Sequence, residues 1–346
     1  MSQIRGQFFT VFRIVLGLAL AALLIWATLR SAKGDLLTDL HHANRPLLAL
    51  AVLLNGLALL ITVIRWDYLL RVQGVFLRFW ELARLTMIGV FFNLAIPGAV
   101  SGDLVKMAYI ARQVPGKKAE CILTIVVDRI MGMLGLFCVA SVLLVLNLPF
   151  LLALPPEERL LQMATFTVGL GSAAGIAGVL LIEFRERLFR HPWIARLADW
   201  CGCRLPAKFT AMIQRLTEAL ELYRRRRLAV FGAFLLAVAV HSCIALDLFV
   251  IGRALGEKLL SLREYFLATQ VANAVAAIPL TPAGVGSRDF VIKSFLNAMD
   301  ATAGKSATVP VTLTLIILFW GLVGALVFIS APHRPDAAAA PAAEPH

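Results

Sequence analysis

Long apolar runs separated by short polar connections dominate this sequence. Six of them approach or exceed the roughly 18 residues that indicate a transmembrane helix, and they span Ile14–Leu29, Pro46–Ile64, Cys121–Leu146, Leu160–Ile182, Leu228–Ile251 and Val309–Ser330. No small-residue cleavage site follows the first run, which predicts an uncleaved helix rather than a signal peptide. Composition agrees, because only 16% of the residues are charged, against about 25% in soluble domains. The pattern therefore predicts an all-helical polytopic membrane protein.

Two further apolar segments are interrupted by proline and glycine. The first runs Phe92-Asn93-Leu94-Ala95-Ile96-Pro97-Gly98-Ala99-Val100-Ser101-Gly102-Asp103 and is followed by Lys106. The second runs from Asn273 through Ile278, Pro279, Pro282, Gly284 and Gly286 to Arg288 and Asp289. Both read asparagine, a short apolar stretch, Ile-Pro, glycine and then charge. Interrupted segments at corresponding positions of two halves are typical of a transport site.

The distribution of basic residues predicts the topology. The connection Glu183–Arg227 contains eleven Arg and Lys residues and is predicted to be cytoplasmic by the positive-inside rule. Counting spans from it, Leu85–Ile110 begins and ends on the cytoplasmic side, yet its 26 residues are too few for two spans of about 20 residues each. Glu264–Asp300 likewise begins and ends outside. We therefore predict six full spans and two re-entrant helical hairpins that enter from opposite faces, eight helical membrane segments in all, as in an inverted repeat.

These elements predict one integral membrane domain over residues 1–330, with halves at 1–182 and 183–330. Residues 183–227 form a basic amphipathic connection, and the alanine- and proline-rich residues 331–346 a disordered tail. Both termini are predicted to be cytoplasmic. The net charge of +12 would favour nucleic-acid binding in a soluble protein, but these arginines cluster between apolar spans. They therefore indicate topology and contact with anionic lipid instead, and no nucleic-acid partner is expected.

Charged residues inside apolar segments are the first candidates for function. Asp128 and Arg129 are adjacent in a helical run, and neighbours in a helix do not face each other, so each needs its own partner. They form either a structural anchor or part of a site. The charges that follow the breaks either line a polar cavity or reach back to the membrane surface, and they are Asp103, Lys106, Arg288 and Asp289.

The breaks also offer backbone groups to a ligand. Each begins a second half-helix whose N-terminus carries free N–H groups and a positive dipole end, which suits an anionic phosphate. The residues that would let the chain turn and approach a ligand closely are Pro97, Gly98, Gly102, Pro279, Pro282, Gly284 and Gly286. Asn93 and Asn273 are either ligands of the site or hydrogen-bonding contacts between helices. The two half-sites are expected to meet near the middle of the membrane.

The sequence contains no nucleophile motif, phosphate loop, metal-ligand cluster or paired carboxylates, so no catalytic residue, metal or cofactor is expected. Its five cysteines are interpreted as reduced thiols. Since no ATPase motif is present, transport is expected to be downhill or ion-coupled, with Asp128 and Asp247 as candidates for protonation. His241, in the same run as Asp247, belongs either to a proton relay or to the buried residues with satisfied hydrogen bonds.

The interrupted segments, together with Asp128-Arg129, resemble the lysylphosphatidylglycerol synthase transmembrane region, also described as a flippase-like family. The resemblance covers roughly residues 10–330. Two positions depart from the family pattern: Lys106 stands where arginine is frequent, and Asp289 where glutamate is common. Charge is kept at both, but Lys106 does not provide the bidentate fork that arginine offers to phosphate.

The resemblance implies translocation or binding of a lipid between leaflets of a bacterial inner membrane. The synthases carry an aminoacyl-transferase domain after the membrane region, whereas residues 331–346 are too few for one, so aminoacylation is not expected. The lipid would be an anionic or modified phospholipid, a glycolipid or a polyprenyl lipid, made by a separate lipid-modifying enzyme. Two alternatives are a membrane-embedded lipid-modifying transferase or its accessory subunit, with Asp103 or Asp289 as catalytic acid or nucleophile, and a small-solute secondary transporter.

Overall fold

The computed structural model describes residues 35–96, 101–183, 223, 226–277, 284–302 and 304–330. All regular elements in these ranges are helical, which confirms the predicted all-α class. The helices are α2 (Asp35–His42), α3 (Arg45–Val72), α4 (Phe79–Ala95), α5 (Ser101–Gln113), α6 (Lys118–Leu146), α7 (Leu148–Leu152), α8 (Arg159–Glu183), α12 (Arg227–Ala254), α13 (Leu262–Ala276), α14 (Ser287–Ala298) and α15 (Lys305–Ser330). Two 3₁₀ turns, η1 (Pro115–Lys117) and η2 (Pro156–Glu158), precede α6 and α8.

Four helices are long and apolar enough to cross a membrane, namely α3, α6, α12 and α15. A helix of 28 residues, such as α3 or α12, is about 42 Å long at 1.5 Å per residue. They correspond to four of the six predicted spans. Helix α8 covers a fifth, with an apolar stretch over Leu161–Ala177, and the first run, Ile14–Leu29, lies outside the described residues. The predicted end of the second span at Ile64 is wrong, because α3 continues through Arg65 to Val72.

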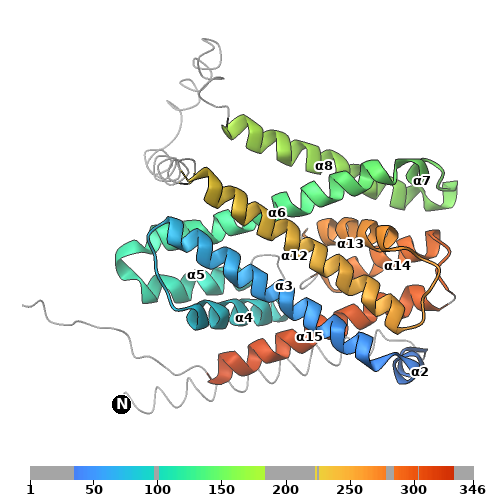
Figure 1. The fold of residues 1–346 in the computed structure, drawn as a ribbon, viewed down its shortest axis with the longest axis horizontal. Coiled ribbons are helices and arrows are strands. Elements are labelled where there is room, and N and C mark those ends of the chain that lie inside the picture. Colours follow the sequence, from blue (N-terminus) through green and yellow to red (C-terminus); the bar gives the residue numbers. More distant parts are fainter. Residues whose placement is uncertain are drawn as a thin grey trace, which may run out of the picture.

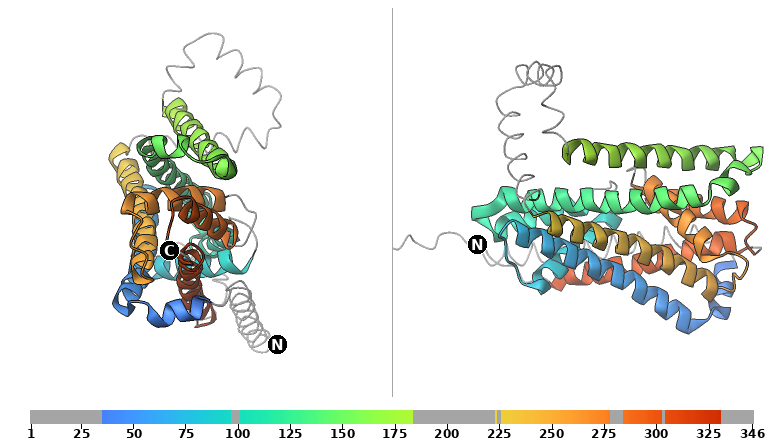
Figure 2. Two further views of the ribbon diagram at one scale, coloured as in Figure 1. Left: turned by 90° about the vertical axis from the view of Figure 1, so that its right-hand side faces the viewer. Right: turned by 45° about the horizontal axis from the view of Figure 1, so that its top comes forward.

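Helices α3 and α12 lie side by side and run antiparallel (Figures 1 and 2). At one end of the pair, the N–H of Asn44 donates to the carbonyl of Ala254 at 2.9 Å. At the other end, the hydroxyl of Tyr223 donates to the carbonyl of Leu69 at 3.2 Å. The C-terminus of α3 and the C-terminus of α12 therefore mark opposite ends of the molecule.

Helices α4 and α5 form an antiparallel pair that starts and finishes at the C-terminal end of α3. The ammonium of Lys117, which follows the pair, donates to the carbonyl of Gly74, which precedes it, at 2.8 Å. Within the pair the backbones touch, since a Cβ built on Gly102 would lie 2.1 Å from the carbonyl oxygen of Gly89. A glycine is therefore required at position 102 for this packing.

Helices α13 and α14 form a second pair, at the C-terminal end of α12 (Figure 1). Here Glu257, which precedes the pair, accepts the N–H of Thr302, which follows it, at 2.5 Å, and that of Leu259 at 2.6 Å. Each pair is thus fastened at its base by one charged side chain that binds backbone of the opposite connection. The two pairs enter the bundle from opposite ends.

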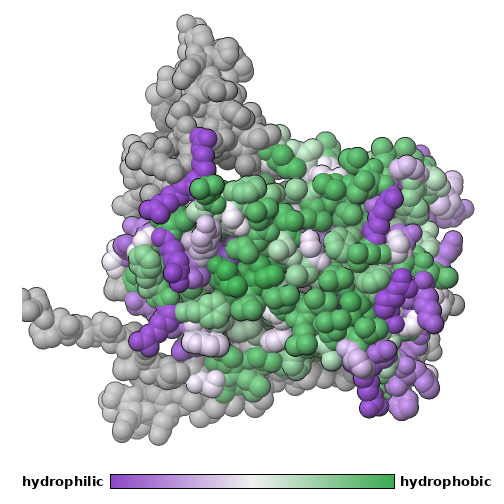
Figure 3. Space-filling model, viewed as in Figure 1, coloured by the Kyte–Doolittle hydropathy of each residue, from purple (hydrophilic) through white to green (hydrophobic). Residues whose placement is uncertain are grey.

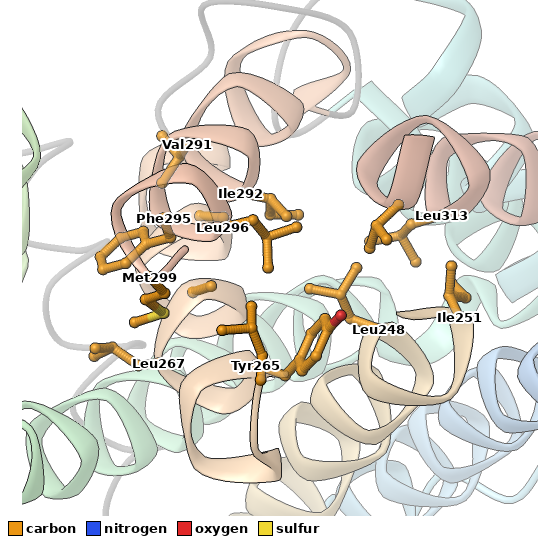
Figure 4. Close-up of a cluster of buried hydrophobic side chains, with 14 of the residues drawn as sticks. Leu248, Ile251, Tyr265, Leu267, Val291, Ile292, Phe295, Leu296, Met299 and Leu313 are labelled. Atoms are coloured by element: carbon orange, nitrogen blue, oxygen red, sulfur yellow. The ribbon is translucent and has the colours of Figure 1, made fainter. Parts of the chain in front are cut away.

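The buried core and the distribution of apolar surface residues are both arranged along the long axis of the bundle. Figure 4 shows Ile292 and Leu296 of α14 in a buried cluster with Leu248 of α12 and Leu313 of α15, which holds the second pair against the long helices. In Figure 3 a hydrophobic belt occupies the middle of the visible face, with hydrophilic residues at both ends of the long axis. Exposed leucines of α3, such as Leu53, contribute to that apolar exterior. Such a belt is what a bilayer requires of the helices that cross it.

Candidate functional site

The first group of buried charges lies where α3, α5 and α6 meet. Arg65 of α3 binds Asp128 of α6 through two contacts, Nε to Oδ1 at 2.7 Å and Nη2 to Oδ2 at 3.1 Å. The residues are only 5% and 6% exposed. Gly132, one turn after Asp128, packs against the guanidinium, and a Cβ there would make an ordinary van der Waals contact with Nη2 at 3.6 Å. This bidentate pair gives each oxygen of the Asp128 carboxylate a charged partner.

Lys106 of α5 lies next to this pair and is also buried, at 6% exposure. Its Nζ stands 4.2 Å from the centroid of the Trp66 ring and 3.9 Å from Oδ1 of Asp103. The ring is fixed in turn, because its Nε1 donates to the hydroxyl of Thr124 at 3.2 Å. A desolvated ammonium over an indole face is stabilised by a cation–π interaction. Gly89 provides the space, since a Cβ there would meet Lys106 Cδ at 2.9 Å.

Arg129 completes the first group from the outside. Its side chain is 44% exposed, and its Nε is 3.5 Å from Oδ2 of Asp103. As expected for adjacent helical residues, Asp128 and Arg129 have different partners. The contacts of Asp103 with Lys106 and Arg129 are both longer than the 2.7–3.2 Å typical of N–H···O bonds. This carboxylate is therefore held by electrostatic attraction rather than by short hydrogen bonds to those two cations.

The two asparagines of the interrupted segments have different surroundings. Oδ1 of Asn93 accepts the N–H of Gly102 at 2.8 Å, which ties α4 to the first turn of α5. This is the interhelical contact that the sequence left open as an alternative to ligand binding. Nδ2 of Asn273 has no hydrogen-bond partner among the described residues. Pro97, Gly98, Pro279 and Pro282 lie outside the described residues.

The second group of charges lies between α14 and α15. Arg288 is 5% exposed, and its Nη2 donates to the hydroxyl of Thr314 at 2.6 Å and to Oδ1 of Asp289 at 3.1 Å. The Thr314 hydroxyl also lies 2.8 and 2.9 Å from the two carboxylate oxygens of Asp289. Asp289 accepts the N–H of Gly286 at 3.3 Å, in the first turn of α14. Gly286 has a φ of 87°, and Gly284 a φ of 72°, a region that glycine adopts readily.

A third buried group joins α3 to α12. Nδ2 of Asn55 donates to Oδ2 of Asp247 at 2.9 Å, and Asp247 is 0% exposed. Its other oxygen, Oδ1, has no hydrogen-bond partner among the described residues. Six residues earlier in α12, Nε2 of His241 is 3.0 Å from the carbonyl oxygen of Gly132. A carbonyl only accepts hydrogen bonds, so Nε2 carries the proton. In a neutral ring Nδ1 is then an acceptor, and it has no hydrogen-bond partner among the described residues.

The groups stand at different depths. Arg65 and Lys106 are each seven residues before the C-terminal end of their helix, which is about 10 Å along the helix axis. Both helices end at the base of the α4–α5 pair. Thr314 is nine residues from the start of α15 at the opposite base, or about 14 Å. Helices of about 42 Å leave both groups well inside the bundle.

Sequence reasoning missed two residues of these groups. Arg65 directly follows the predicted end of an apolar run, and its burial depends on Asp128, 63 positions later. Thr314 is a lone hydroxyl in an apolar helix, and such residues usually bond the backbone of their own helix. The one available signal for Arg65 was the second charge, Asp128, in the middle of another apolar run.

Comparison with known proteins agrees with a membrane protein built of apolar helices. The sequence profile of the family described as lysylphosphatidylglycerol synthase TM region matches residues 14–330. The chain belongs to this family. A UPF0104 membrane protein of Pyrococcus horikoshii is 24% identical over 328 residues, which covers 89% of this chain and 92% of that protein. This member of the family is accordingly a membrane protein with several apolar helices, as the sequence predicted.

Proposed function

We propose that this family member moves the headgroup of an anionic or modified lipid between the two leaflets of a membrane. The observation that carries the proposal is the placement of cations by two helix pairs from opposite ends of the bundle. The α4–α5 pair places Lys106 beside Arg129 of α6, and the α13–α14 pair places Arg288 beside α15. Charges inside a membrane protein are costly and commonly mark substrate or ion pathways. The burial of Lys106 and Arg288 therefore supports a site that binds an anion.

The chemistry of both groups suits a phosphate. Lys106 offers a compact point charge and Arg129 a planar fork of donors. Both lie near the first turn of α5, and the N-terminal turn of a helix favours negative charge. In the structure this position is taken by the carboxylate of Asp103, held at 3.5 and 3.9 Å. A phosphate that replaced it would form shorter, charge-assisted hydrogen bonds with the same cations.

Orientation follows from the same helices. The end with the base of the α4–α5 pair is basic, with residues such as Arg78, Arg112, Lys117 and Arg226. By the positive-inside rule this end is cytoplasmic. The α4–α5 and α13–α14 pairs then act as re-entrant hairpins from the cytoplasmic and outer faces, related as an inverted repeat, with both termini in the cytoplasm of a bacterium. A separate lipid-modifying enzyme would supply the lipid.

We further propose that the protein catalyses no covalent step. Asp103 and Asp289, the acids considered for a transferase, are each next to a cation at 3.9 Å or less, and Asp289 also bonds Thr314. Both carboxylates therefore already have cationic partners within the protein, which supports a binding role rather than a catalytic one.

The test is headgroup movement in reconstituted vesicles that contain a trace of phosphatidylglycerol with a fluorophore on an acyl chain or headgroup. Accessibility of the headgroup probe to an impermeant quencher reports its leaflet. Arg129→Gln and Arg288→Gln should each reduce movement at least tenfold, while Lys293→Gln should not, because Lys293 is an exposed cation of the same α14 helix. An uncharged glycerolipid probe serves as the substrate control. Equal movement in all three variants would contradict the proposal.

A further inference from the structure

Asp247 is a buried carboxylate that the groups described above leave incompletely compensated. It is 0% exposed on α12, a helix long and apolar enough to cross a membrane. Its one hydrogen bond in the described structure comes from Nδ2 of Asn55, at 2.9 Å to Oδ2, and Oδ1 is buried without a partner there. No described Lys, Arg or His nitrogen lies within 4 Å of it, because it takes part in none of the ion pairs. An ionised carboxylate in such a place is costly.

Asp128 provides the contrast. It is buried to a similar degree and lies in another long helix, α6. Both of its oxygens face the guanidinium of Arg65, at 2.7 and 3.1 Å. Both oxygens of Asp128 therefore have a partner that is always charged, whereas Oδ1 of Asp247 has no hydrogen-bond partner in the described structure. The two carboxylates that the sequence left equal as protonation candidates are therefore different in the structure.

The groups around Asp247 come from several elements. Helix α3 contributes Asn55, which is neutral. Helix α14 contributes Arg288, which interacts electrostatically with Asp247 but directs its hydrogen bonds to Asp289 and Thr314. The same helix α12 carries Cys243, which also interacts electrostatically with Asp247, and His241, six residues before it. Gln270 of α13 donates to the carbonyl of His241, Thr314 of α15 bonds Asp289, and neither side chain is charged.

We propose that Asp247 is a proton-binding site, and that Asn55 holds one of its oxygens while the proton occupies the other. Protonation transfers a proton from hydronium to Oδ1, which leaves water and a neutral carboxylic acid. A metal ion fits less well, because a cation needs several oxygen ligands, and the described residues contain no group of three His, Cys, Asp or Glu that could hold one. The buried free oxygen accommodates a proton without further ligands.

The position of the site indicates what the proton does. Arg288 belongs to the second group of cations, and its charge acts on Asp247 although no hydrogen bond or ion pair joins the two. When Asp247 is neutral, the field at Arg288 is more positive and favours an anion. Proton and anionic headgroup therefore bind with positive coupling, which is reciprocal by linkage. This coupling rests on the proposed lipid transport, whereas proton binding by Asp247 does not.

Proton binding is tested directly by infrared spectroscopy of the full-length protein in lipid. The wild type should show the C=O band of a buried protonated carboxylic acid that disappears as the pH rises. Asp247→Asn should lose this band, and Asp128→Asn should retain it. Asp300→Asn is the matched control, since Asp300 is exposed and its φ of 54° suits asparagine. A band that survives in folded Asp247→Asn, or a wild type with no such band at any pH at which it is folded, would overturn the assignment.

Coupling is tested in the vesicle assay with labelled phosphatidylglycerol. A pH difference of one unit should shift the leaflet ratio of the probe by up to about tenfold for one proton per lipid. Asp247→Asn should abolish the response to pH, whereas Asp300→Asn should keep it. A response to a sodium gradient at constant pH would overturn the choice of a proton. If wild-type vesicles move no lipid, the proposed function fails, and the infrared result still decides whether Asp247 binds a proton.

Discussion

Removing one partner of the buried Arg65–Asp128 ion pair should be one of the more costly single substitutions in this protein. Asp128→Ala leaves the guanidinium of Arg65 in a site where the residue is only 5% exposed. Removing one partner of a buried pair costs about 3–5 kcal/mol, because the remaining charge is uncompensated.

The experiment measures the free energy of unfolding of Asp128→Ala in detergent micelles with increasing denaturant. The matched control is Arg71→Ala, since the Arg71–Asp67 pair lies on the same helix but the Arg71 side chain is 56% exposed. An exposed pair of this kind contributes about 0–1 kcal/mol. The double variant Arg65→Met/Asp128→Leu should recover most of the loss, because an apolar pair needs no counter-ion. A cost below about 1 kcal/mol for Asp128→Ala would refute the reasoning.

Three further predictions concern the α4–α5 pair and the connection between α12 and α13, which contains Glu257. Asp103→Asn should raise the affinity for phosphate or phosphatidylglycerol several-fold, because it removes the carboxylate that occupies the cations; titration calorimetry measures it, and unchanged or weaker binding would contradict the competition. Gly102→Ala should destabilise the fold by several kcal/mol or prevent folding, since the Cβ would lie 2.1 Å from the Gly89 carbonyl, whereas Gly116→Ala, with nothing within 4 Å of its Cβ, should cost at most about 1 kcal/mol. Burial raises the pKa of Glu257, but hydrogen bonds from Thr302, Leu259 and Leu260 outweigh it and the pKa falls below its ordinary value of 4.5. A lowered folded-state pKa gives stability that is present above the unfolded pKa and is lost as the pH falls through the folded pKa. The thermal unfolding temperature of the wild type should therefore fall as the pH drops below 4.5, and that of Glu257→Gln should fall less.

Hydropathy alone predicted much of the fold, because the bilayer requires long apolar helices and leaves few alternatives. The predicted runs became α3, α6, α12 and α15, and the Gly/Pro breaks separate α4 from α5 and α13 from α14. That both ends of each short pair lie at one end of the bundle agrees with the charge-based counting, although passage through a membrane stays a prediction. The boundaries were less accurate because a charged residue such as Arg65 ends a hydropathy run whether it is exposed or buried.

The partners of the site residues could not be predicted in the same way. Asp128 and Arg129 were singled out correctly as charges within an apolar run, but Arg65 and Asp103 come from other helices. Only the three-dimensional packing decides which cation meets which carboxylate. Asn93 and Asn273 occupy equivalent positions in sequence, yet one bonds the next half-helix and the other has an unpartnered amide nitrogen within the described structure. Similarity of pattern therefore does not imply similarity of bonding.

The two half-sites differ in a way that bears on the proposed transport. In the first, Asp103 is held at 3.5 and 3.9 Å and Arg129 is 44% exposed. In the second, Arg288, Asp289 and Thr314 are bonded at 2.6–3.1 Å, and the side chain of Arg288 is only 6% exposed. Short hydrogen bonds must be broken before Arg288 can bind an anion, whereas Arg129 is accessible as it stands. A lipid headgroup would therefore meet the first site from the basic end, and release of Arg288 from Thr314 would be the step that opens the second.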